Sequence, residues 1–187
     1  MMMRFLLAVF SALFVSACAS DEYRPWLAVP GAYDEAAELE SFTLERTACF
    51  GFCPVYTVTV SERDILLFKG ERFVAEAEGA VSKRLPDGAF VNLIEIARAH
   101  NFAEFGDRYP NEASDNCEAI ATDMPSVIIS IETKRLAHAV SVYQGCMGFE
   151  GRERFNEMVL AMDAVLDIDD WIGPRESFYR DAEADGS

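Results

Sequence analysis

The middle of the chain alternates apolar and polar residues over several short segments, as half-buried strands do. The first such segments are 42–47, 56–60, 65–68 and 73–77. The polar stretch 69–72 predicts a turn, so these four segments predict an antiparallel β-meander. Residues 126–132 and 136–143 alternate again around a short polar stretch, and they predict a C-terminal β-hairpin.

Two other segments repeat apolar residues every three to four positions, as amphipathic helices do. The first follows Pro86-Asp87-Gly88 and ends near His100. The second is predicted over 152–167, and we expect Trp171 to fill the core beyond it. Strand and helix patterns stand in separate blocks, which predicts an α+β domain: an antiparallel β-meander and a C-terminal β-hairpin, packed with two amphipathic helices.

The first 17 residues have the pattern of a signal peptide, with Arg4 before the apolar stretch 5–15. Eleven helical residues reach about 17 Å, well short of a hydrocarbon core of about 30 Å. The sequence Val15-Ser16-Ala17-Cys18 resembles the lipobox of bacterial lipoproteins. That resemblance implies cleavage before Cys18, a diacylglycerol on its thiol and a further acyl chain, such as palmitate, on its amino group. The alternative is an ordinary secretory signal that happens to precede a cysteine.

These features divide the chain into four parts. We expect a signal peptide at 1–17, a lipidated tether at 18–40, a single α+β domain at 41–173 and a flexible tail at 174–187. The membrane is the expected partner of Cys18, and the expected location is the bacterial cell envelope, facing the periplasm. Ala19, in a position where Asp retains well-studied lipoproteins at the inner membrane, favours the outer membrane.

Composition fits one folded domain: the chain has 187 residues, of which 51% are hydrophobic. The formal net charge is -16. A surface this acidic repels nucleic acid, so nucleic acid is excluded as an expected partner.

Four cysteines follow the lipobox: Cys49, Cys53, Cys117 and Cys146. An even number in an exported chain predicts disulfides. Pairing Cys117 with Cys146 would staple the C-terminal hairpin, which favours that bridge together with Cys49–Cys53, but crosswise pairing stays open. Two other interpretations are possible: a zinc site formed by the four cysteines, or a thiol–disulfide redox pair at Cys49 and Cys53. Their three intervening residues differ from the two of thioredoxin-type motifs.

The block Cys49-Phe50-Gly51-Phe52-Cys53-Pro54-Val55-Tyr56 resembles the signature of a bacterial domain family of unknown function. The later block Tyr143-Gln144-Gly145-Cys146 matches a second motif of that family. The resemblance covers about residues 41–172 and implies a β-meander, a helix, a hairpin and a final helix in an exported protein. It implies no catalytic residue. Members commonly place a glycine turn where this chain has residues 61–64.

Catalytic motifs of the common hydrolases and P-loop proteins are missing from the sequence. One hypothesis is a hydrolase site assembled from His138 and scattered acids. The acidic residues between 163 and 170 are interpreted as solvated surface. No cofactor is expected. Phe50, Gly51 and Phe52 form an aromatic tip between two cysteines, which predicts a contact point for an envelope protein partner. The sequence therefore favours a lipid-anchored binding or structural module, with a redox protein and a hydrolase as alternatives.

Overall fold

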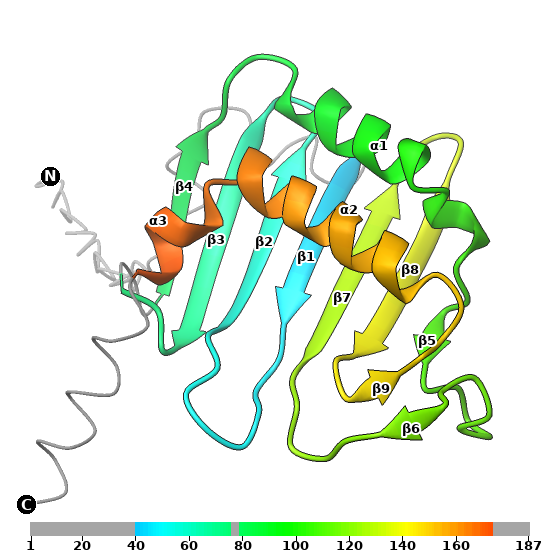
Figure 1. The fold of residues 1–187 in the computed structure, drawn as a ribbon. Coiled ribbons are helices and arrows are strands. Elements are labelled where there is room, and N and C mark those ends of the chain that lie inside the picture. The colour runs from blue at the N-terminus through cyan, green and yellow to red at the C-terminus, as the bar shows by residue number, and fades with distance from the viewer. Residues whose placement is uncertain (1–39, 76–78, 174–187) are drawn as a thin grey trace, which may run out of the picture.

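The computed structural model describes residues 40–75 and 79–173, and Figure 1 shows their arrangement. The strands are β1 (Ser41–Arg46), β2 (Val55–Ser61), β3 (Ile65–Arg72), β4 (Gly79–Arg84), β5 (Arg108–Tyr109), β6 (Ala119–Ile120), β7 (Ser126–Glu132), β8 (Ala137–Tyr143) and β9 (Cys146–Met147). The helices are α1 (Ala89–Ala99), the short 3-10 helix η2 (Phe102–Glu104), α2 (Arg152–Val165) and α3 (Ile168–Ile172). The class is α+β, as predicted.

One mixed sheet contains seven of these strands, in the order β4-β3-β2-β1-β7-β8-β5. Strand β1 lies at its centre and pairs antiparallel with both β2 and β7. The predicted meander and the predicted hairpin are therefore halves of a single sheet. Only β5 runs parallel to its neighbour, β8. Strands β6 and β9 form a separate two-stranded sheet.

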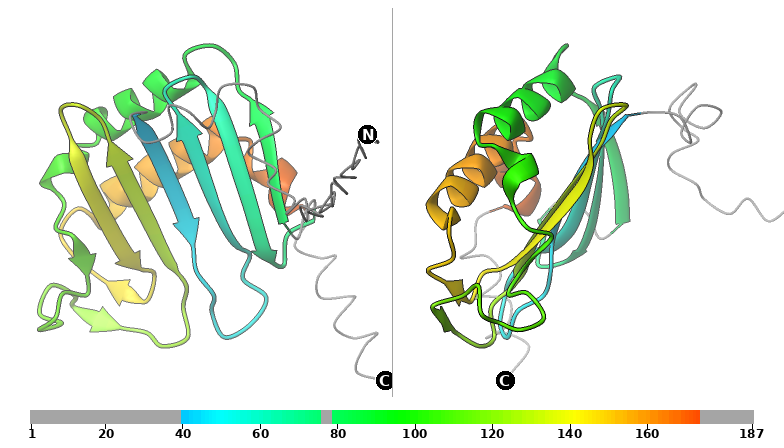
Figure 2. Two further views of the ribbon diagram at one scale, coloured as in Figure 1. Left: turned by 180° about the vertical axis from the view of Figure 1, so that it is seen from behind. Right: turned by 90° about the vertical axis from the view of Figure 1, so that its right-hand side faces the viewer.

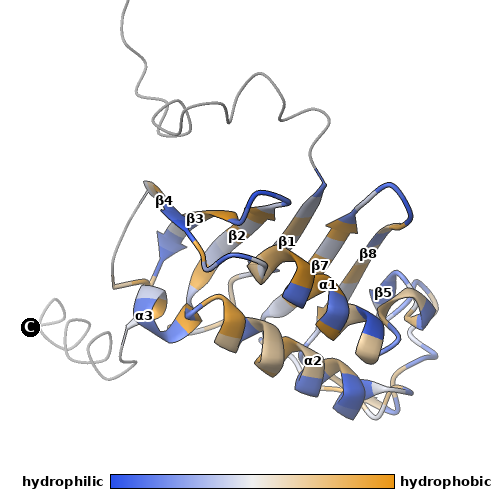
Figure 3. Cartoon of the chain, turned by 90° about the horizontal axis from the view of Figure 1, so that it is seen from above, coloured by the Kyte–Doolittle hydropathy of each residue, from blue (hydrophilic) through white to orange (hydrophobic). Residues whose placement is uncertain are grey.

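Helices α1 and α2 cover one face of the sheet, and the described elements leave the other face open (Figure 2). Figure 3 shows hydrophobic and hydrophilic residues mixed on both helices, as expected for helices with one buried side. In β2 and β7 the inward side chains alternate with outward ones, and the inward ones are buried. The sheet residues of this core are Phe42, Leu44, Tyr56, Val58, Val60, Leu66, Phe68, Val127, Ile129, Ile131, Val140 and Val142.

The prediction for residues 69–75 was wrong. Strand β3 continues through the expected turn to Arg72, because β2 starts at Val55 and offers backbone partners that far along. The next strand, β4, begins only at Gly79. Residues 73–75, which were predicted to open a strand, form no strand, and Phe73 and Ala75 are bends.

The second predicted helix was too long. Helix α2 ends at Val165, and Asp167 adopts a left-handed conformation (φ 52°) that turns the chain into α3. This break lets Trp171 stack on Phe68, with 5.0 Å between ring centroids, as the expected plug of the core. Strands β5, β6 and β9 were not predicted, because two residues are too few for alternation to show.

Candidate functional site

The loop between β1 and β2 is closed by a disulfide between Cys49 and Cys53, whose Cα atoms are 5.7 Å apart. Gly51, at the tip, has φ +142°, a conformation that side chains other than glycine rarely adopt. Phe50 beside it is 89% exposed. The bridge thus holds a large aromatic ring out of the fold rather than in it.

This loop is fastened to the segment that leads into β7. The backbone N–H of Thr47 donates to the Ser126 carbonyl (3.0 Å), and the N–H of Ser126 donates to Thr47 Oγ1 (2.7 Å). Further out, the N–H of Phe50 donates to the carbonyl of Asp123 (3.1 Å). Because the backbone of Phe50 is bonded on one side and bridged on the other, the aromatic tip has a defined position.

A groove of about 410 Å³ lies between the two fastened segments. One wall is formed by the aromatic tip and the other by Met124 and Pro125. Phe52, which lines the groove, packs edge-on against Phe73, with ring centroids 5.3 Å apart. The groove is therefore lined mainly by apolar and aromatic side chains, as binding sites usually are.

Arg46 lines the same groove and joins it to the buried side of the sheet. Its Nε donates to the Tyr56 hydroxyl (2.9 Å), and its Nη2 donates to Asp163 Oδ2 on α2 (2.5 Å). Burial raises the pKa of Tyr56 to about 12, with Arg46 acting in the opposite direction. Burial also raises the pKa of Asp163, again opposed by Arg46. Within the described residues, Asp163 Oδ1 has no hydrogen-bond partner.

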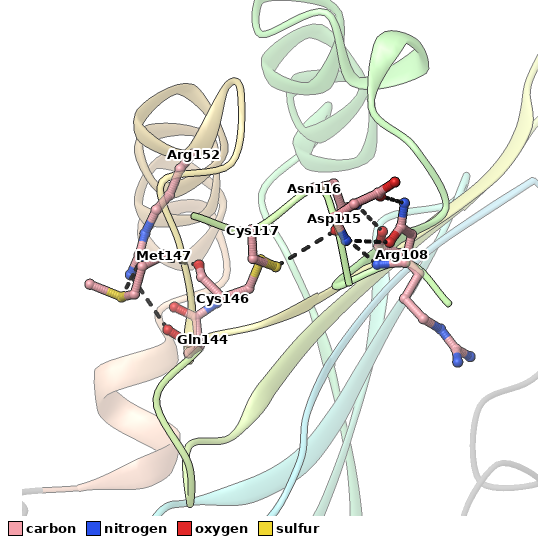
Figure 4. The surroundings of a disulfide bond; sticks show 9 residues. Arg108, Asp115, Asn116, Cys117, Gln144, Cys146, Met147 and Arg152 are labelled. Carbon is pink, nitrogen blue, oxygen red and sulfur yellow. Dashed lines mark hydrogen bonds between the residues drawn. A yellow bond between two sulfur atoms is a disulfide. The ribbon is translucent and has the colours of Figure 1, made fainter. Parts of the chain in front are cut away.

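The second disulfide joins Cys117 to Cys146, with Cα atoms 5.3 Å apart, so both bridges follow the pairing that the sequence favours. Figure 4 shows its surroundings. Arg152, the first residue of α2, donates to the Cys146 carbonyl (3.0 Å) and contacts Met147 Sδ (2.7 Å). On the other side, Asn116 Nδ2 donates to the carbonyl of Arg108 (3.0 Å). The bridge therefore ties the polar loop before β7 to the start of α2.

Exposed apolar side chains gather at the end of the sheet that carries both disulfides. Among the described residues, eight large hydrophobic side chains are exposed. Five of them form what we call the apolar end surface: Phe50, Phe52, Ile120, Met124 and Met147. They come from the loop after β1, from β6 and β9, and from the connection between β6 and β7, which all lie at the lower end of the sheet in Figure 1. The sequence pattern indicates only the two phenylalanines of this surface, since a single methionine in a polar loop forms no pattern.

A larger groove of about 730 Å³ lies at the opposite end of the sheet, between α1 and the β7–β8 turn. Its floor consists of core residues such as Phe102 and Ile131, and its rim carries both signs of charge, for example at Glu40 and Lys134. None of the residues that the sequence singled out lines it. We therefore place the candidate site at the apolar end surface.

The remaining candidates have structural partners. His138 Nε2 lies 3.0 Å from the carbonyl oxygen of Phe105, and its Nδ1 lies 3.8 Å from Asp107 Oδ1. Asp163, a partly buried acid, forms an ion pair with Arg46 and not with His138. The structure therefore does not bring His138 and Asp163 together as one catalytic pair. Asp167 pairs with Lys83 (3.4 Å). No group of three or more His, Cys, Asp or Glu that could hold a metal ion occurs in residues 40–75 and 79–173.

The predicted lipidation site, Cys18, lies outside the described residues, as do the signal peptide and the tail. Within the part of the chain that the structure describes, no helix is long and apolar enough to span a membrane.

Residues 40–166 match the family model described as a domain of unknown function (DUF6438). The search of the curated proteins found no match.

Proposed function

The chain belongs to the DUF6438 family, a domain of unknown function, and from that premise we propose that it is a lipid-anchored protein of the bacterial envelope whose domain binds a protein partner. The proposed contact is the apolar end surface, with Phe50 at its centre. One observation carries this proposal: a disulfide-closed loop keeps Phe50 89% exposed. Covering a phenylalanine ring with a partner stabilises a complex by about 1.5–3 kcal/mol.

The fixed position of the loop supports binding for a second reason. Association normally costs free energy because flexible side chains and loops become ordered. Here the Cys49–Cys53 bridge and the bond from Phe50 to Asp123 hold the tip before any partner arrives. Aromatic side chains in such positions are the usual energetic anchors of interfaces.

The position of the chain entry supports the anchored arrangement. Residue Glu40 precedes β1, and the aromatic tip follows it, so the two lie at opposite ends of that strand. Six strand residues span about 20 Å. A lipid at Cys18 would hold the domain from the Glu40 end and leave the apolar end surface directed toward the periplasm.

The test is photo-crosslinking in intact bacterial envelopes. The full chain would carry a benzophenone amino acid in place of Phe50, and irradiation is expected to yield a discrete adduct with one envelope protein. The matched control carries the same group at Leu160, which is 68% exposed on α2, away from the candidate site.

Adduct formation at position 50 but not at position 160 would support the proposed surface. Equal labelling at both positions, or no adduct at position 50, would overturn it. Replacing Cys49 and Cys53 together by alanine is expected to reduce the adduct yield, because the tip then loses its fixed position.

A further inference from the structure

The face of the sheet that the described elements leave open carries a self-complementary pattern of charges and side-chain sizes. We call this the open face and define it by the outward residues of β4, β3, β2, β1 and β7, which lie opposite the helices (Figure 2). The strand registers arrange fifteen of them in three rows that cross all five strands, while the outward residues Val55, Glu71 and Ser126 lie beyond these rows. The first row is Ser82, Leu67, Thr59, Thr43 and Ser130; the second is Ala80, Lys69, Thr57, Glu45 and Ile128; the third is Arg84, Ile65, Ser61, Ser41 and Glu132.

Strand β2 is the middle strand of these five, with Thr57 and Thr59 on its outward side. Consider a second copy related by a twofold axis that runs along β2. Such an axis places β1 of one copy over β3 of the other, and β7 of one over β4 of the other, while every residue keeps its row. Interfaces with twofold symmetry are isologous, so each residue pair occurs twice.

In this arrangement every charged residue of the three rows faces a residue of opposite charge on the second copy. Glu45 on β1 meets Lys69 on β3 of the second copy, and Glu132 on β7 meets Arg84 on β4. Each pair occurs twice, and no like charges face one another within the rows. Lys69 also forms an exposed ion pair with Glu71 of its own chain (3.3 Å), a pair of small energetic value.

The sizes of the uncharged residues match as well. Leu67 meets Thr43, Ile65 meets Ser41, and Ile128 meets Ala80, so each branched aliphatic side chain faces a smaller one. Alternation of large and small residues across facing positions is what lets two layers interdigitate. In a chain with net charge -16, the first row also carries no charge at all.

From this pattern we infer that the open face binds a second copy of the same chain, forming a face-to-face dimer with its twofold axis along β2. Four strand spacings of about 4.8 Å and the width of a strand give about 24 Å, and three rows give about 20 Å. The face therefore covers about 480 Å² per copy, against about 800 Å² in a standard stable interface. The dimer is expected to be weak and concentration-dependent.

The axis has a consequence for the two ends of the molecule. Because it runs along the strands, both copies have residue Glu40 at the same end and both aromatic tips at the other. Two copies that are tethered to one membrane satisfy this geometry, and confinement to a surface raises their effective concentration.

Charge exchange tests the inference. Two full-length copies with different affinity tags would be co-expressed and purified from envelopes, and co-capture would be measured. Glu45→Lys paired with itself, and Lys69→Glu paired with itself, each place like charges opposite one another, and co-capture is expected to fall at least about tenfold. Glu45→Lys paired with Lys69→Glu restores both opposite-charge contacts, and co-capture is expected to return.

The matched controls are Glu95→Lys and Arg98→Glu, which reverse an exposed ion pair on α1, on the helix side of the molecule. They are expected to leave co-capture unchanged. Recovery in the mixed pair also shows that both variants fold. Absence of wild-type co-capture, or single variants that behave like the wild type, or a mixed pair that stays apart, would each overturn the dimer.

A second measurement locates the axis. Thr59→Cys lies on the axis, so its two copies are expected to stand about 10 Å apart across the packed sheets and to join through a short bismaleimide. Ala139→Cys lies in the same row but on β8, three strands from the axis. Its two copies would be about 30 Å apart and are expected to stay unlinked. Equal linking of both variants would contradict the geometry.

Discussion

At the scale of single residues, Arg46 departs most clearly from the pattern around it. It follows Phe42 and Leu44 on the inward face of β1, where alternation calls for an apolar side chain. The structure resolves this by bringing Asp163, 117 residues away, within 2.5 Å of its guanidinium. The side chains of Arg46 and Asp163 are only 27% and 21% exposed, so each depends on the other.

Arg46→Met is therefore expected to destabilise the domain by about 2 kcal/mol at pH 7, since it leaves the Asp163 carboxylate unpaired. Burial already raises the pKa of Asp163 in the folded protein, so the folded state binds the proton more tightly than the unfolded state. Stability from this group is thus lost as pH rises above the ordinary Asp value. Removing the opposing Arg46 should steepen this loss.

Urea denaturation of the full chain at pH 7 and at pH 4 measures both effects. The loss caused by Arg46→Met should be smaller at pH 4 than at pH 7, because the pKa of Asp163 is raised and a protonated, neutral carboxyl needs no ion-pair partner. Arg98→Met, which breaks an exposed ion pair with Glu95, is the control and should change stability by less than about 0.5 kcal/mol. A loss for Arg46→Met that is the same at both pH values would argue against this account.

At the scale of elements, the turn between β2 and β3 holds the start of α1. Helix α1 has Gly88 at its N-cap position and no side-chain cap of its own. Asp64 supplies the cap from the turn: Oδ2 accepts the N–H of Gly88 and Oδ1 accepts the N–H of Phe90, both at 2.8 Å. Asp64 also adopts a left-handed conformation (φ 59°). The residue that stands in place of a glycine turn thus connects the meander to the helix.

Two substitutions of Asp64 separate these roles. Asp64→Gly loses the cap but tolerates the positive φ, and it is expected to cost about 1 kcal/mol of unfolding free energy. Asp64→Ala loses the cap and is strained as well, and it is expected to cost about 2 kcal/mol. Thermal or urea unfolding measures both, with Asp87→Ala as the control. If alanine proved no worse than glycine at position 64, the expected strain from the positive φ would be contradicted.

At the scale of the whole molecule, the chain enters at one end of the sheet and presents its exposed apolar side chains at the other. Glu40 accepts a bond from the backbone N–H of Lys134 (2.9 Å), which holds the entry point to the β7–β8 turn. Both disulfides lie toward the opposite end, on the loops that form the apolar end surface. This polarity suits a domain held at one end and contacted at the other.

The lipid anchor at Cys18 can be tested by mass spectrometry of the intact chain. The full chain isolated from envelopes is expected to begin at Cys18, to carry acyl mass and to sediment with membranes. Cys18→Ser should lose the acyl mass, because serine cannot form the thioether, whereas Ser20→Ala should retain it. A wild-type chain without acyl mass would remove the anchor from the proposed function and leave the contact surface to stand by itself.

Local patterns were sufficient to predict most of the strands and helices. Alternation placed β7 at its observed residues, because one buried face imposes a period of two. The spacing of Phe90, Leu93 and Ala97 placed α1 in the same way, and all three are buried. The aromatic tip was visible because two cysteines and a glycine confine it within five residues. These features could be predicted because each is determined by residues that are close together in the sequence.

Other features depend on residues that are far apart in the chain, and only the tertiary structure decided them. Pairing of β1 with β7 turned two predicted units into one sheet, and no local pattern encodes which strand edges meet. The same holds for the contact between Arg46 and Asp163 and for the cap that Asp64 gives to α1. The open face arises likewise, since its rows of matching charges exist only once five strands lie side by side in register.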